Sequence, residues 1–293
     1  MAGRMTRTLS AKLLAVGLLA AGLAAPVRLH AQASEIPSAA PPTDAKLTPE
    51  QHGRILIDQM IEALGGRAWL DRTSIQFDGH GAAFFHGQPD TGISEYHEQR
   101  RLPASGLPEA DRIGFLTIRG MIMPGKKIDV VQIWTGGQGY EVTFKGQTTL
   151  PKEQVEDYYR RRAHSIEEVV RTWIHQPGVM IVAEGTSMVE RRLVDKVTVL
   201  SANNDAVTIE LDAATHLPRR RIFQWRNEQF KDYDEDAEEY DDYHTFQGLP
   251  TPMTITRYHN GDMASQRFYT KVVYNLGFDP ALFDPAAPFN KKK

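Results

Sequence analysis

The sequence contains no cysteine among its 293 residues. Disulfides, a cysteine nucleophile and a lipid anchor attached through cysteine are therefore excluded. It also contains no G-x-S-x-G elbow, no H-E-x-x-H zinc motif and no glycine-rich loop between a strand and a helix. The folded part must therefore be held by its hydrophobic core alone, and a chain of about 260 residues buries roughly 70–75% of its unfolded surface.

The sequence also lacks an excess of basic residues, since its formal net charge is −3. Residues 1–33 carry four basic residues and no acid, so their removal takes the formal net charge to about −7. Nucleic-acid binding relies on clustered lysine and arginine, so no nucleic-acid partner is expected. No segment after the N-terminal region is long and apolar enough to span a bilayer, so the mature chain is not expected to be membrane-spanning.

The N-terminal region has the order of features that export machinery reads. Residues 4–12 contain three basic residues and no acid. Leu13–Ala25 is an apolar run of thirteen residues, and Ala31-Gln32-Ala33 is a small-x-small cleavage site. A retained anchor is the alternative, but it needs about 20 apolar residues. The sequence predicts a secretory signal peptide over 1–33, cleaved after Ala33, and a periplasmic or secreted product.

One folded domain is expected after the signal. Residues 34–47 are rich in proline, alanine and serine, which indicates a flexible linker. Residues 48–293 then form the domain. Thr48 and Gln51 make a capping box around Pro49, and Gly65-Gly66 ends the amphipathic helix that this box begins.

From residue 75 onward the apolar residues alternate with period two, as in half-buried strands. The alternation is plainest in Val207–Leu211 (VTIEL). Short turn-forming connectors favour antiparallel hairpins and meanders. The predicted strands are Ile75–Phe85, Ile93–Arg101, Arg112–Arg119, Lys126–Trp134, Tyr140–Phe144, Val179–Val189, Arg192–Leu200, Ala206–Asp212, Arg219–Trp225, Glu238–Phe246, Met253–Tyr258 and Ala264–Tyr274.

One helical segment, Pro151–Ile174, interrupts the strands, with apolar residues at helical spacing. Ser165 and Glu168 form a second capping box, which predicts a break into two helices near His164. A dozen strands and few helices indicate a mainly β (α+β) fold with one large antiparallel sheet.

Two groups of residues suggest metal sites. His80, His86, Glu95, His97 and Glu98 lie on adjacent predicted strands, and imidazole with carboxylate suits zinc. A polar, solvent-facing hairpin explains the same pattern, and we favour it.

The acidic run Asp232–Asp242 has the ligand type that calcium prefers, but it lacks the EF-hand pattern. We interpret it as a solvated loop leading into a strand. The triplets Arg160–Arg162 and Arg219–Arg221, together with Arg171, are candidates for binding carboxylate or phosphate head groups.

Aromatic and apolar side chains are spread over many predicted strands and one helix. Most must form the core, but a wide sheet with few helices leaves room for an apolar cavity. Such a cavity needs no catalytic residue and no cofactor, because each buried methylene of an acyl chain contributes about 0.8 kcal/mol. The residues that we predict to line it are Phe115, Ile133, Trp134, Trp173, Phe223, Trp225 and Phe268.

Several local signatures, in this order, resemble the lipoprotein-carrier (LolA/LolB-like) superfamily, in particular its outer-membrane lipoprotein-sorting members. They cover nearly the whole mature chain, and each mostly encodes a turn. The signatures are Ala63–Gly66, Trp134–Tyr140, Leu211–Pro218, Tyr240–Tyr243 with Gly248–Pro252, and Tyr274-Asn275 with Phe283–Pro285.

This resemblance implies an incomplete antiparallel β-barrel whose open side is covered by helices, with Pro151–Ile174 as part of the lid. It also implies a hydrophobic cavity that accepts acyl chains. The expected function is a non-enzymatic carrier or binder whose partners are a lipid or an acylated protein and an outer-membrane acceptor. The alternatives are a metal-assisted hydrolase that uses His80, His86, Glu95 and His97, and an envelope protein-interaction module.

Overall fold

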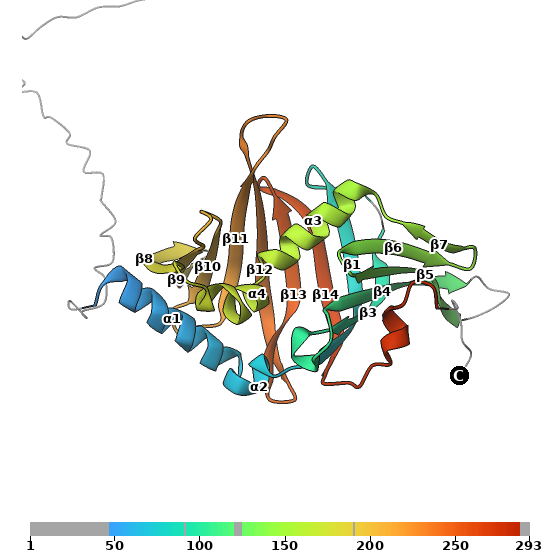
Figure 1. The fold of residues 1–293 in the computed structure, drawn as a ribbon, viewed down its shortest axis with the longest axis horizontal. Helices are drawn as coiled ribbons and strands as arrows, with labels where there is room; N and C mark the ends of the chain where they lie inside the picture. Colours follow the sequence, from blue (N-terminus) through green and yellow to red (C-terminus); the bar gives the residue numbers. More distant parts are fainter. Residues whose placement is uncertain (1–46, 91, 120–124, 190, 288–293) are drawn as a thin grey trace, which may run out of the picture. The chain divides into compact units, whose positions relative to one another are not determined.

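A computed structural model describes residues 47–90, 92–119, 125–189 and 191–287 (Figure 1). The predicted signal peptide and nearly all of the predicted linker lie outside the described residues. No helix within the described ranges has the length and apolar character needed to cross a membrane.

The first helix, α1 (Pro49–Leu64), begins and ends where the sequence predicts. The Thr48 side chain accepts a hydrogen bond from the Gln51 amide, and the Gln51 side chain accepts one from the Thr48 amide, which confirms the capping box. Gly65 ends the helix with φ 117°, a left-handed conformation that favours glycine. A short helix, α2 (Gly66–Leu70), follows at once and was not predicted.

All twelve predicted strands are present, and two short ones were not predicted. The strands are β1 (Ser74–Phe85), β2 (Gln88–Pro89), β3 (Ser94–Arg101), β4 (Ala110–Arg119), β5 (Gly125–Thr135), β6 (Gln138–Thr143), β7 (Gly146–Thr149), β8 (Met180–Val189), β9 (Arg192–Leu200), β10 (Ala206–Asp212), β11 (Pro218–Arg226), β12 (Tyr233–Phe246), β13 (Leu249–His259) and β14 (Asp262–Tyr274). Three short 3₁₀ helices are also described: η1 (Pro103–Ser105), η2 (Trp173–His175) and η3 (Pro280–Phe283).

The described strands form one antiparallel sheet in the order β7-β6-β5-β4-β3-β1-β14-β13-β12-β11-β10-β9-β8, with β2 paired to β1. Most neighbours are consecutive in the chain. The pairing of β1 with β14 joins two meanders, with Ile75 opposite Tyr274. The two ends of the order, β7 and β8, do not pair with each other. The predicted mainly β fold with an incomplete barrel is therefore confirmed.

The acidic run belongs mostly to β12, so its interpretation as a solvated loop is wrong. β12 pairs with β11, which places Arg220 opposite Glu239 and Arg221 opposite Glu238. Arg221 also contacts Asp236 at 3.2 Å, and both side chains are almost completely buried. The second arginine triplet thus neutralises acids of the neighbouring strand, which allows this charged segment to form a strand.

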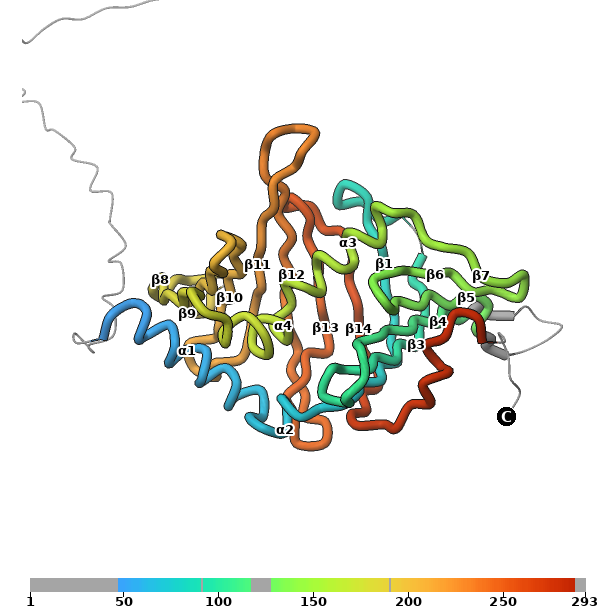
Figure 2. The backbone as a smooth tube through the Cα atoms, viewed as in Figure 1, coloured from blue at the N-terminus to red at the C-terminus, as the bar shows by residue number. Residues whose placement is uncertain are grey.

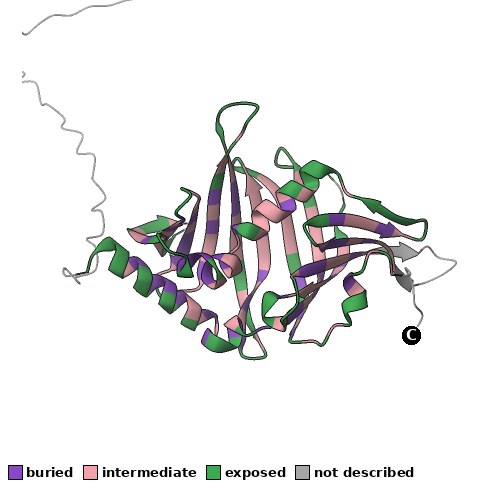
Figure 3. Ribbon diagram, viewed as in Figure 1, coloured by how far each residue is buried: buried purple, intermediate pink, exposed green. Residues whose placement is uncertain are grey.

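The main hydrophobic core contains residues of α1 and α4 (Ile166–Arg171) and of strands along most of the sheet, including β1, β3 and β14 as well as β8–β11. The buried side of α1, visible in Figure 3, packs with α4 against β8–β11. A Cβ added at Gly53 of α1 would lie 2.8 Å from the Ile181 carbonyl oxygen of β8. The helix therefore lies directly against the backbone of the edge strand.

The predicted helical segment is broken as expected, into α3 (Lys152–Ala163) and α4. The Ser165 side chain accepts a hydrogen bond from the Glu168 amide at the start of α4. Figures 1 and 2 show α3 crossing the face of the sheet. Its contacts run from Trp225 of β11 to Gln138 of β6.

Candidate ligand-binding cavity

A cavity of about 310 Å³ lies between the sheet and the helices α3 and α4. Its walls come from α1, α2, α3 and α4 and from eight strands: β1, β3, β4, β5, β11, β12, β13 and β14. Ligand pockets of proteins typically measure about 300–1,000 Å³, so this cavity is large enough for a small ligand.

Apolar and aromatic side chains form a large part of the wall. Phe77 stacks on Tyr269 at 4.2 Å between ring centroids, and Trp134 stacks on Tyr158 at 4.0 Å. The stack of Trp134 and Tyr158 attaches α3 to β5. The remaining apolar and aromatic residues of the wall are Leu64, Trp69, Ile75, Ile113, Ile166, Pro218, Tyr240, Tyr243, Pro250, Pro252, Ile255 and Tyr274.

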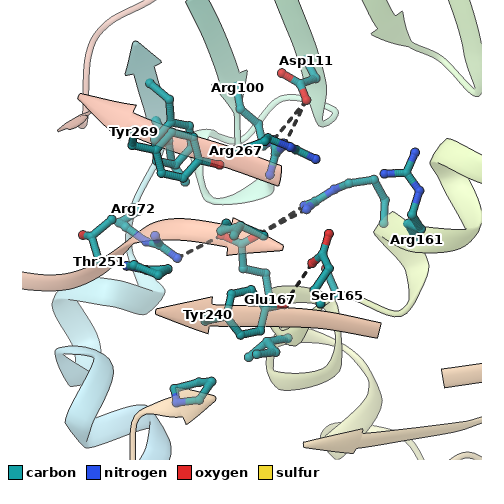
Figure 4. A pocket seen from close by; sticks show the side chains of 18 of the residues that line it. Arg72, Arg100, Asp111, Arg161, Ser165, Glu167, Tyr240, Thr251, Arg267 and Tyr269 are labelled. Carbon is teal, nitrogen blue, oxygen red and sulfur yellow. Dashed lines mark hydrogen bonds and ion pairs between the residues drawn. The ribbon is translucent and has the colours of Figure 1, made fainter. Parts of the chain in front are cut away.

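The rest of the wall is strongly charged, and arginine predominates. Five arginines line the cavity, against three carboxylates. Figure 4 shows several of these side chains around the cavity. The arginines are Arg72, Arg100, Arg161, Arg162 and Arg267, and the acids are Asp111, Glu167 and Glu238.

On one side of the cavity, Arg100 joins two buried carboxylates. It donates a hydrogen bond to Glu98 at 2.6 Å. It also donates hydrogen bonds to Asp111 at 3.1 and 3.3 Å (Figure 4). Tyr158 of α3 donates a further hydrogen bond to Asp111 at 3.1 Å. Burial and the neighbouring Asp111 carboxylate raise the pKa of Glu98.

On the α4 side, Glu167 accepts hydrogen bonds from Arg72 at 3.1 Å and from Arg162 at 3.3 Å. Burial alone would raise the pKa of Glu167, but Arg162 and Arg72 hold it at about 2. The guanidinium of Arg72 also lies over the rings of Trp69 and Tyr274, at 4.6 and 5.3 Å from their centroids. Glu167 therefore offsets the charge of Arg72 beside the rings of Trp69 and Tyr274.

Two buried polar atoms of the wall have no hydrogen-bond partner among the described residues. They are Oδ1 of Asp111 and Nε1 of Trp134, and both side chains are almost fully buried. A buried group without a partner costs roughly 1–3 kcal/mol. Water or a polar group of a ligand in the cavity would lower that cost.

Of the seven residues predicted to line a cavity, only Trp134 lines this one. Ile133 lies between the lining residues Gln132 and Trp134, so alternation turns it to the other face, where it packs with Val131 and Val142. Phe268 likewise follows the lining residue Arg267 and precedes the lining residue Tyr269, and it is 40% exposed.

The other four belong to the core or its edge. Trp173 and Phe223 are buried in the main core, while Phe115 and Trp225 are half-buried against it. Arg160 of α3 lies over the Trp225 ring at 4.6 Å. A ligand-binding role for these residues remains a prediction.

The residues that we considered as an alternative zinc site are only partly brought together, since the register of β1 and β3 places His80 opposite Glu95 but Asp78 opposite His97. Within the described part of the chain, no group of three or more His, Asp or Glu side chains could hold a metal ion. His97 contacts Asp78, and the exposed His86 lies 3.6 Å from Asp262. Glu98 takes the opposite strand face from Glu95 and His97, because it follows His97 directly in β3.

The charged wall of the cavity was predicted only in part. Arg161 and Arg162 line the cavity and belong to the triplet Arg160–Arg162, a predicted candidate for binding head groups, whereas Arg72, Arg100 and Arg267 were not predicted. Arg100, Arg161 and Arg267 are more than 60 residues apart in sequence, so no local pattern groups them. Alternation in β3 offers one signal, since Glu98 and Arg100 share a face with the aromatic Tyr96.

The open antiparallel sheet with helices over one face defines a fold class that solved structures share. The chain is similar to a DUF1329 family protein from Desulfovibrio piger, with a TM-score of 0.52, 11% identity, and coverage of 81% of this chain and 98% of that one. At this identity the similarity concerns the fold alone. The open antiparallel sheet with helices over it, which the resemblance led us to expect, is confirmed at that level.

Two further solved structures align less closely. A domain from Vibrio parahaemolyticus, named for outer membrane lipoprotein sorting, has a TM-score of 0.49 and 8% identity, covering 78% of this chain and 97% of that one. A LolA superfamily protein from Nitrosomonas europaea has a TM-score of 0.43 and 10% identity, covering 79% and 96%. No family model and no curated protein matches the chain.

Proposed function

We propose that the protein binds a lipid-like amphiphile non-covalently in the cavity beneath α3 and α4. The observation that carries this proposal is the position of the cavity. It lies between the sheet and the helices α3 and α4, and side chains of the main hydrophobic core, such as Ile75, Phe77 and Tyr269, form part of its wall. Apolar surface therefore remains available to a guest molecule.

The length of the cavity suits an elongated ligand. Tyr274 and Arg267 both line it and lie seven positions apart on β14. At 3.2–3.4 Å per strand residue, these positions are roughly 20 Å apart. Each methylene of a chain buried along this wall would contribute about 0.8 kcal/mol.

The proposal includes the cellular setting that the sequence predicts. After export, the protein would carry a lipid or an acylated protein through the periplasm and deliver it to an outer-membrane acceptor. No covalent step is required for this function. The alternative role as an envelope protein-interaction module stays a prediction.

The proposal is tested by purifying the protein from the envelope fraction without detergent, extracting it with solvent and analysing the extract by mass spectrometry. A lipid in near-stoichiometric amount is expected. Leu193→Trp, at an exposed position of β9 outside the cavity, should carry the same amount, whereas Ile255→Trp, which fills the cavity, should carry much less. If the wild type and both variants are purified without bound lipid, the proposal is contradicted.

A further inference from the structure

The charges of the cavity wall are unequally compensated. Arg72, Arg100 and Arg162 donate hydrogen bonds to carboxylates, at distances of 2.6–3.3 Å. These three arginines are therefore held by the protein itself. Arg267 differs because its carboxylate contact is longer, and Arg161 differs because it shares its carboxylate partner with another arginine.

Arg267 of β14 is the least engaged arginine of the cavity. Its contact with a carboxylate is an ion pair with Glu98 at 3.5 Å, and Glu98 is already bonded to Arg100 at 2.6 Å. The guanidinium of Arg267 donates no hydrogen bond to any other residue that the structure describes. Arg267 lines the cavity, and its side chain is 27% exposed.

Arg161 of α3 shares its single carboxylate partner with another arginine. Its Nε and Nη2 donate to one oxygen of Asp157, at 3.2 and 3.1 Å. Arg257 also donates to Asp157, at 3.2 and 3.4 Å to its two oxygens. Burial and the nearby charge of Arg257 lower the pKa of Arg161, as expected where positive charges are close together.

The remaining acid near these two arginines is already neutralised. Glu238 lies 3.1 Å from Arg221, which is almost completely buried, and accepts a hydrogen bond from Tyr240 at 3.0 Å. Although burial opposes ionisation, Arg221 and Arg267 hold the pKa of Glu238 well below its usual range. Glu238 is thus shared among several cations and leaves Arg161 and Arg267 with unused donors.

We propose that Arg161 and Arg267 form an anion subsite that binds the carboxylate or phosphate group of an amphiphile. The apolar part of that ligand would lie along β14 toward Trp69 and Tyr274. A guanidinium offers five donors in a planar fork that fits both anions. This inference rests on the proposed function and names the chemical class of its ligand.

The test compares three probes with the same twelve-carbon chain: dodecanoate, dodecyl phosphate and the neutral 1-dodecanol. Their affinities for the purified full chain are measured by isothermal titration calorimetry, at concentrations below micelle formation. The two anions are expected to bind at least tenfold more tightly than the alcohol. Arg161→Gln and Arg267→Gln should each weaken anion binding about tenfold and leave 1-dodecanol binding unchanged.

Arg219→Gln is the matched control, because it removes the same charge from a strand arginine that does not line this cavity and pairs with Asp241. Its anion affinities should equal those of the wild type. Thermal unfolding of each variant verifies that it is folded. Arg267→Lys, which keeps the charge, should retain part of the affinity if Arg267→Gln is unstable.

The outcomes separate the two proposals. Tight binding of only one anion supports the subsite and identifies its ligand as a carboxylate or a phosphate. Equal binding of all three probes overturns the subsite and leaves the lipid-binding cavity intact. Absence of binding by any probe overturns both. An equal loss in Arg219→Gln would show a non-specific charge effect and also overturn the subsite.

Discussion

The hydroxyl of Tyr158 donates a hydrogen bond to the carboxylate of Asp111 at 3.1 Å and so connects α3 to β4 across the cavity wall. Tyr158 is the one buried residue of α3. Other contacts of the helix with the sheet include ion pairs such as Asp157 with Arg257. The helix that covers the cavity is therefore attached mainly through polar contacts, unlike α1, which packs through an apolar face.

This attachment predicts the effect of Tyr158→Phe. The substitution keeps a ring that can stack on Trp134 but removes the donor to buried Asp111. The free energy of unfolding should fall by about 1–2 kcal/mol, measured by urea denaturation. Tyr159→Phe loses only an exposed bond to the Gln138 carbonyl and should cost less. Equal losses in the two variants would contradict this role of Tyr158.

Buried ion pairs in β11 and β12 make a second prediction. Asp236→Ala leaves Arg221 and Arg257 without their buried partner and should lower the free energy of unfolding by about 3–5 kcal/mol. Asp241→Ala removes a largely exposed partner of Arg219 and should cost about 0–1 kcal/mol. Chemical denaturation measures both. A small loss for Asp236→Ala would refute the importance of the buried network.

The lowered pKa of Glu167 predicts a dependence of stability on pH. Its pKa is about 2 in the folded protein and 4.5 as the reference value, so its ionised form stabilises the fold above about pH 4.5. This stabilisation is lost as the pH falls from about 4.5 toward 2. The wild type should therefore exceed Glu167→Gln in unfolding free energy at pH 7, and the difference should shrink below pH 4.5. A difference that does not change with pH would contradict the assignment.

Gly53 provides a prediction about how closely α1 packs on β8. Replacing glycine by alanine inside a helix usually stabilises it, by about 0.5–1 kcal/mol. Here the added methyl would meet the β8 backbone at 2.8 Å, so Gly53→Ala should destabilise the protein by about 1–3 kcal/mol. Arg54→Ala on the exposed side of α1 should change stability by less than about 0.5 kcal/mol. Thermal or urea unfolding of both variants distinguishes these outcomes, and a stabilised Gly53→Ala would show that α1 lies farther from β8.

Helices and strands could be predicted because capping boxes and apolar alternation depend only on residues close together in the sequence. The capping box of Thr48 and Gln51 defines the start of α1, and the alternation in Val207–Leu211 defines β10. The segment Tyr233–Ala237 was missed as part of a strand because its acids are typical of a solvated loop. Their arginine partners lie on β11, and only the register of two strands brings them together.

The candidate site was predictable only in outline. A cavity beneath helices followed from the resemblance, and Trp134 was placed in its wall. The triplet that contains Arg161 was a head-group candidate, but its grouping with Arg100 and Arg267 was not foreseen, because these residues come from α3, β3 and β14. No spacing within one segment reveals that three such side chains face the same cavity.

The central claim is that the space beneath α3 holds the apolar part of a ligand. Equilibrium dialysis of radiolabelled dodecanoate against the wild type, Ile255→Trp and Leu193→Trp tests it most directly. We expect saturable binding of one molecule per chain by the wild type and by Leu193→Trp, weakened at least tenfold when the indole of Ile255→Trp fills the cavity. Undiminished binding by a folded Ile255→Trp, or no saturable binding by the wild type, would contradict the claim.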